Sequence, residues 1–131
     1  MRIYLDASPV IYTVEQVPLL GPIVDARLQQ PGTIIVVSEL TRLDCRVRPI
    51  RAADQSLVQD FDQFFVQVVE ETVGLERQVM ERATEIRASF GFRTPDAIHL
   101  AASLHSACDV FLTNDAHLAD FTGISVELVQ R

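Results

Sequence analysis

The chain contains no lysine, and all 11 of its basic residues are arginines. Against 18 Asp and Glu residues they leave a formal net charge of -7 at pH 7. Without lysine there is no Gly-x-x-x-x-Gly-Lys loop, and there is no Gly-x-Gly-x-x-Gly either, so both common nucleotide-binding loops are excluded. Phosphate binding normally relies on a basic surface, so a nucleic-acid partner requires arginines gathered locally.

Cysteine and long hydrophobic runs are also scarce. Cys45 and Cys108 are the only two cysteines, and neither has a neighbour spaced for zinc, so we expect buried thiols. The longest apolar runs, such as residues 34–37, are far shorter than the roughly 18 residues that span a bilayer. Asp6 interrupts the N-terminus before the apolar core of a signal peptide. We therefore expect a cytoplasmic protein without membrane contact.

Short apolar runs alternate with amphipathic stretches along the chain. Its 131 residues and hydrophobic content of 48% suit one globular domain, residues 1–131. Strands alternating with helices predict a parallel sheet covered on both faces, which is a three-layer α/β/α sandwich. The expected strands, about five in number, cover residues 3–5, 33–37, 65–69, 110–113 and 125–129.

Acidic residues follow three of these predicted strands. Asp6, Glu39 and Asp115 each come directly, or within two residues, after an apolar run. Because the carboxyl ends of parallel strands meet at one sheet edge, we expect these carboxylates at the edge where α/β proteins bind ligands. Asp96 lies in the first turn of a predicted helix instead, and it reaches the same edge only if that helix begins there.

Several polar residues next to these acids match helix-capping patterns. Thr94 is expected to be an N-cap, with Pro95 at the first helical position. Ser8, Ser38 and Asn114 are expected to cap the helices that follow the first, second and fourth strands. The sequence between residues 39 and 51 favours a helix that ends near residue 49, followed by a new helix from about residue 51.

Carboxylates gathered in one pocket repel one another, and at least one would stay protonated at neutral pH. A divalent cation removes this conflict, and Mg²⁺ and Mn²⁺ prefer oxygen ligands of this kind. Such an ion can activate a water molecule and stabilise the leaving oxygen of a phosphodiester. The sequence therefore predicts a metal-dependent phosphodiester hydrolase.

Four segments of the chain resemble the acidic motifs of PIN-domain nucleases, and more narrowly those of VapC toxins from bacterial VapBC toxin–antitoxin systems. They occur in the family's order and cover nearly the whole chain from Asp6 to Asp115. The segments are Tyr4-Leu5-Asp6-Ala7-Ser8-Pro9, Ser38-Glu39-Leu40, Thr94-Pro95-Asp96-Ala97-Ile98-His99 and Thr113-Asn114-Asp115. After the fourth acid, Asp115, an aromatic residue is common in the family, whereas this chain has Ala116-His117-Leu118.

This resemblance implies an endoribonuclease that uses Mg²⁺ or Mn²⁺ and acts as the toxin of a type II toxin–antitoxin pair. It further implies a homodimer, an RNA substrate and a VapB-type antitoxin that blocks the active-site groove. The metal-binding and catalytic residues implied are Asp6, Glu39, Asp96 and Asp115. Supporting roles fall to Ser8, Thr113 and Asn114.

Residues 42–51 hold four arginines against one acid, which is the local positive surface that an RNA partner requires. We predict that Arg42, Arg46 and Arg48 contact RNA phosphates. The alternative is that these arginines pair with acids such as Asp44 or Asp54 on a solvated helix.

Two other functions remain open at this point. A PIN-like fold can serve as a non-catalytic binding module, although all four acids are present here. A housekeeping PIN nuclease would need no antitoxin. His99 lies one turn after Asp96 on an apolar helix, where a buried, hydrogen-bonded histidine is expected rather than a general base.

Overall fold

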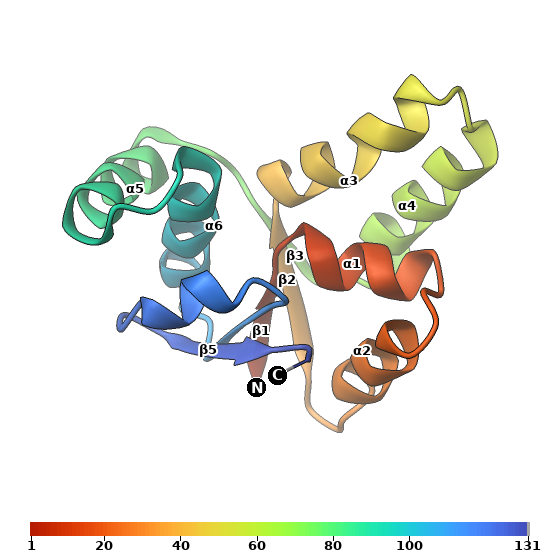
Figure 1. Cartoon of the computed structure of the whole chain (residues 1–131), viewed down its shortest axis with the longest axis horizontal. Coiled ribbons are helices and arrows are strands. Elements are labelled where there is room, and N and C mark those ends of the chain that lie inside the picture. The colour runs from red at the N-terminus through yellow and green to blue at the C-terminus, as the bar shows by residue number, and fades with distance from the viewer. Residues whose placement is uncertain (131) are drawn as a thin grey trace.

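Five parallel strands form a single sheet in the computed structural model, which describes residues 1–130 (Figure 1). The strand order is β3-β2-β1-β4-β5, and every neighbouring pair is parallel. In the centre of the sheet Tyr4 lies opposite Val36 on one side and Phe111 on the other. The strands are β1 (Arg2–Leu5), β2 (Ile34–Ser38), β3 (Glu71–Val73), β4 (Val110–Thr113) and β5 (Ser125–Leu128).

Helices cover both faces of this sheet, which confirms the predicted three-layer α/β/α sandwich. One group contains α1 (Ala7–Val14), α2 (Leu20–Leu28), α3 (Glu39–Arg51) and α4 (Gln55–Gln67). The other contains α5 (Arg77–Phe90) and α6 (Thr94–His105), and Figure 1 shows the two groups on opposite sides of the strands. A short 3-10 helix, η1 (Ala116–Asp120), joins β4 to β5. Among residues 1–130, no helix has the length and apolarity that crossing a membrane requires.

The alternation of side chains along the strands divides the core into two parts. Tyr4, Val36 and Phe111 point toward α5 and α6, and the Tyr4 and Phe111 rings stack with centroids 5.2 Å apart. The neighbouring residues on the same strands, such as Leu5 and Val37, pack with α1, α2 and α4. A polar aromatic side chain therefore occupies the middle of the α5–α6 side of the core.

The third strand is the main point where the sequence prediction was wrong. Residues 65–69 were expected to form it, but Phe65 belongs to α4 and packs with Phe61 and Phe64 on one helical face. The helical spacing of these rings outweighs the short apolar run that follows. The strand that pairs with β2 is instead β3, which has only three residues.

The helix break expected at Pro49 is also absent. α3 continues through Pro49 to Arg51, and α4 starts only at Gln55. Pro49 is buried and lies near the end of α3, where the missing backbone donor removes a single hydrogen bond from the last turns. The other predicted boundaries are close to the observed ones, and Gly91 ends α5 in the left-handed conformation with φ of 72°.

Candidate metal centre

Asp6 lies at the point where β1 ends and α1 begins, beside the gap where the connectivity of the sheet reverses between β1 and β4. Ligands of open α/β sheets bind at such switch points. The Asp6 side chain is buried, with 8% of its surface exposed. Its Oδ2 accepts a 2.5 Å hydrogen bond from Thr113 Oγ1, at the end of β4. Among the described side chains, Asp6 Oδ1 is the one buried nitrogen or oxygen atom without a hydrogen-bond partner.

Burial raises the pKa of Asp6 from an ordinary value of 3.8 to about 6. His99 and the Thr113 hydroxyl favour the charged form and limit the rise, whereas the charge of Asp96 adds to it. A buried carboxylate with an unpaired oxygen is costly to ionise unless a positive charge accompanies it. The environment of Asp6 therefore suits a bound cation.

Asp96 provides the second carboxylate of this pocket. It lies in the first turn of α6, and its side chain is only 13% exposed. Its negative charge contributes to the raised pKa of Asp6. Arg93 Nε lies 3.2 Å from Asp96 Oδ2, but the Arg93 side chain is 79% exposed, so this pair is open to solvent. The hydrogen bond between Tyr4 and His99 holds the first turns of α6 beside β1, while a metal ion shared by Asp6 and Asp96 stays a prediction.

Thr113 connects the ends of β1 and β4. Besides donating to Asp6, its hydroxyl accepts a 3.1 Å hydrogen bond from the backbone amide of Asp115. The Asp115 carboxylate itself accepts from the His117 amide at 3.0 Å and caps η1.

Glu39 follows β2 directly, as predicted, but it is exposed. Ser38 caps α3 in a capping box with Thr41, which confirms the predicted cap and fixes where Glu39 begins the helix. The Glu39 side chain lines a groove of about 550 Å³ along α3 together with arginines and apolar residues. It is not among the groups that shift the pKa of Asp6.

The four acids therefore do not form a closed cage in this conformation. Among residues 1–130, no three Asp, Glu, His or Cys side chains form a group arranged to hold a metal ion. The structure brings Asp6 and Thr113 into contact, while Asp96 pairs with Arg93, Asp115 caps η1 and Glu39 faces the α3 groove. A shared ion bound by all four acids stays a prediction. The orphaned oxygen of Asp6 is the feature that fits a cation.

Three of the predicted caps were wrong. Helix α1 starts at Ala7, so Asp6 occupies the N-cap position and Ser8 is already helical. Helix α6 starts at Thr94, one residue earlier than expected, and Arg93 is its N-cap. Asn114 caps no helix: its amide donates to the Tyr12 hydroxyl at 3.0 Å, and its carbonyl oxygen accepts from the Gln130 amide. Tertiary partners have replaced the local hydrogen bonds that the sequence pattern favoured.

Arg42, Arg46 and Arg51 line the α3 groove that also holds Glu39, whereas Arg48 lies outside it. Arg46 Nε lies 2.9 Å from Asp62 on α4, and Arg42 lies 3.6 Å from the same carboxylate. Asp44 and Asp54, the acids named as alternative partners for these arginines, have other contacts. Asp44 contacts His99, and Asp54 caps α4. Arg48 is exposed.

His99 is buried and hydrogen-bonded, as expected. Its Nδ1 lies 2.7 Å from the Tyr4 hydroxyl, and its Nε2 lies 3.1 Å from Asp44 Oδ2. No role is predicted for Tyr4 from the sequence, although a polar side chain within a buried strand is a usable signal.

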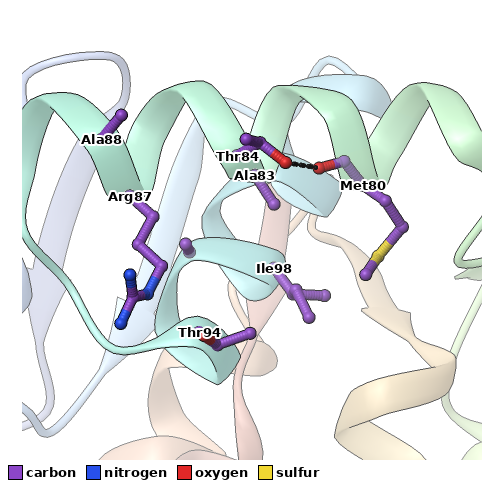
Figure 2. A pocket seen from close by; sticks show the side chains of 8 residues that line it. Met80, Ala83, Thr84, Arg87, Ala88, Thr94 and Ile98 are labelled. Atoms are coloured by element: carbon purple, nitrogen blue, oxygen red, sulfur yellow. Dashed lines mark hydrogen bonds between the residues drawn. The ribbon is translucent and has the colours of Figure 1, made fainter.

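Another hollow, of about 330 Å³, lies between α5 and α6. Figure 2 shows Arg87 and Met80 of α5 on one side of it, with Thr94 and Ile98 of α6 on the other. Its lining holds no carboxylate, so it offers no ligands for a hard cation.

Solved structures with the same fold come from toxin–antitoxin systems. VapBC2 from Rickettsia felis, bound to a promoter DNA fragment, has a TM-score of 0.81 at 12% identity over 98% of both chains. A toxin–antitoxin complex from Klebsiella pneumoniae has a TM-score of 0.73 at 16% identity over 98% of both chains. VapC20 from Mycobacterium tuberculosis, described as a toxin that cleaves the sarcin–ricin loop, has a TM-score of 0.70 at 11% identity, covering 92% of this chain and 90% of that one.

No curated protein sequence matches the chain. The PIN domain family model, in contrast, matches residues 3–124, a span that contains all four acidic motifs. The family model covers most of the chain, and the parallel sheet has the fold of the VapC structures, so the chain belongs to the PIN domain family.

Proposed function

We propose that the chain is an endoribonuclease that depends on Mg²⁺ or Mn²⁺ and is the toxin of a VapBC-type pair. The observation that carries this proposal is the buried Asp6 Oδ1, which has no hydrogen-bond partner among the described residues. Membership of the PIN family and the likeness to VapC folds support a nuclease of this class.

Asp6 and Asp96 would hold the metal ion, with Glu39 and Asp115 completing the set of acidic groups. When bound, the ion supplies an activated water molecule and stabilises the leaving oxygen. The chain's own residues prepare for this chemistry. The Thr113 hydroxyl holds Oδ2 of Asp6 and leaves Oδ1 without a partner, so that it could bind the ion. Arg42 and Arg46, which share Asp62 in the structure, and the exposed Arg48 would supply the positive charge for RNA phosphates that the chain as a whole lacks.

The cleavage test uses the purified full-length chain and a structured RNA with single-stranded loops. We expect cleavage with Mg²⁺ or Mn²⁺, none in excess EDTA, and recovery when the metal is restored. Equal cleavage in excess chelator would refute the metal mechanism. No cleavage of any RNA under any metal condition would favour the non-catalytic binding module instead.

The proposed partners are a VapB-type antitoxin and a second copy of this chain. The α3 groove beside the site exposes Leu43, Val47 and Ile50, which share one helical face and suit an amphipathic segment of the antitoxin. Expression of the chain alone should arrest growth, and coexpression with the product of a small adjacent gene should restore it. Growth without arrest, together with metal-dependent cleavage, would identify a housekeeping nuclease.

Replacing Arg46 with glutamine is expected to weaken RNA binding by about fivefold, equivalent to about 1 kcal/mol for a partly exposed charge contact. The slope of log affinity against log salt should also fall by about 0.7 for each lost phosphate contact on a single strand. RNA binding is measured at several salt concentrations in the Asp96→Asn background. The control is Arg82→Gln, an exposed arginine on α5. Equal losses in both variants would assign the effect to overall charge.

A further inference from the structure

A buried hydrogen-bond cluster surrounds the Tyr4 hydroxyl. This hydroxyl donates to Ser38 Oγ at 2.8 Å and lies 2.7 Å from His99 Nδ1 and 3.3 Å from Thr41 Oγ1. Tyr4, Ser38 and Thr41 are completely buried, and His99 is 4% exposed. Burial raises the pKa of the Tyr4 hydroxyl above its ordinary value, so this group stays neutral.

The partners of Tyr4 are adjacent to the proposed metal ligands on three separate elements. Tyr4 itself precedes Asp6 by two residues at the end of β1. Ser38 is the residue directly before Glu39, at the start of α3. His99 lies three residues after Asp96, on the same side of α6. One hydroxyl therefore joins the three elements that present three of the four carboxylates.

The outer members of the cluster have partners of their own. Thr41 Oγ1 donates to the carbonyl oxygen of Leu5, the residue before Asp6, at 3.0 Å and accepts from the Ser38 amide at 3.2 Å. His99 Nε2 lies 3.1 Å from Asp44 on α3, which ties α6 to α3 a second time. The side chains of Thr41 and His99 are therefore each held by more than one hydrogen bond, as in the networks that orient metal ligands.

Packing alone does not require this hydroxyl. The Tyr4 ring stacks on Phe111 and meets the His99 ring edge-on, and a phenylalanine ring would keep both contacts. A buried hydroxyl must also be hydrogen-bonded to offset its desolvation, so a fully apolar ring would be the simpler core residue. The hydroxyl is therefore not needed to fill the core. Its hydrogen bonds instead orient α3 and α6 relative to β1.

We propose that the Tyr4 hydroxyl is a positioning group that sets the spacing of the three segments that carry Asp6, Glu39 and Asp96, and so the affinity of these acids for a divalent cation. The metal part of this inference rests on the proposed function. Tyr4 does not contact the ion or the RNA. It acts through Ser38 and His99.

The test compares Tyr4→Phe with two controls in the full-length chain. Ser103→Ala removes a buried hydroxyl of α6 that donates only within its own helix, to Leu100 at 2.7 Å. Val24→Ala destabilises the core on the opposite side of the sheet. Mn²⁺ binding is measured by electron paramagnetic resonance at a temperature where all variants are folded. We expect about a tenfold higher Kd for Tyr4→Phe, the size typical of groups that orient metal ligands, and an unchanged Kd in both controls.

Cleavage kinetics give a second readout. For Tyr4→Phe we expect a higher Mn²⁺ concentration at half-maximal rate, an unchanged KM for RNA and recovery of kcat in excess Mn²⁺. A merely structural role would lower thermal stability and leave the Mn²⁺ Kd at the wild-type value, and that result would overturn the proposal.

Metal-free crystal structures separate this inference from the proposed function. In Tyr4→Phe we expect the distances between the carboxylates of Asp6, Asp96 and Glu39 to change by about 0.5 Å or more, the tolerance of a preorganised site. Unchanged distances would overturn the positioning role even if the chain is a nuclease. A wild-type chain that binds no Mn²⁺ would overturn the proposed function, and the distances would still decide the role of Tyr4.

Discussion

Replacing Asp96 with asparagine is expected to lower the rate of RNA cleavage by about a thousandfold or more, and replacing Asp6 should do the same. Both substitutions keep the shape of the side chain but remove the negative charge that would hold the cation. A loss of this size corresponds to about 4 kcal/mol of transition-state stabilisation, typical of removing one preorganised electrostatic contact. Rates are measured in single-turnover experiments at saturating Mn²⁺.

The control for this pair is Asp60→Asn, which neutralises an exposed carboxylate on α4. It should cleave at the wild-type rate. Circular dichroism should show the same fold for all three variants, because neither Asp6 nor Asp96 supplies a side-chain cap to its helix. An Asp96→Asn variant that retains more than about a tenth of the activity would remove Asp96 from the proposed metal site.

The second large effect concerns stability. Without metal, Asp6→Asn should increase the free energy of unfolding at pH 7.5 by up to about 3 kcal/mol. Each unit by which folding raises the pKa of Asp6 costs about 1.4 kcal/mol once the carboxyl is ionised. Burial raises the pKa of Asp6 from 3.8 to about 6, so ionising this carboxyl opposes folding. Its contribution to stability is fully present below pH 3.8 and is lost as the pH rises through about 6.

Urea unfolding in EDTA between pH 4 and pH 7.5 measures this effect. The difference between Asp6→Asn and the wild type should be small at pH 4 and should grow through pH 6. Saturating Mn²⁺ should then stabilise the wild type and leave Asp6→Asn nearly unchanged, since a ligand stabilises only the state that binds it. A variant less stable than the wild type at pH 7.5 in EDTA would contradict the raised pKa.

Much of the fold could be predicted from the sequence because its signals are local. The β-branched run at residues 33–37 lies almost entirely within β2, and the apolar run at 110–113 coincides with β4. β3 could not be found in this way, because it has three residues and only Val73 among them is buried. Its position depends on pairing with β2, which is a tertiary interaction.

The candidate site could be predicted in part for a similar reason. Acids that follow strands can be recognised in the sequence, and the structure places Asp6 at the end of β1 and Glu39 directly after β2. The Tyr4 cluster was out of reach because its hydrogen bonds join residues 34 and 95 positions apart. The caps failed at Ser8 and Asn114, where the helix boundary and tertiary contacts decided the outcome.

The most direct test of the central claim is an anomalous diffraction map from crystals of the wild-type chain soaked in Mn²⁺. The orphaned oxygen of Asp6 predicts a peak about 2.1 Å from Oδ1, the distance usual for a small divalent cation, with Asp96 also facing the ion. A peak elsewhere on the molecule, with Asp6 Oδ1 still without a partner, would contradict the assignment of this pocket as the metal centre.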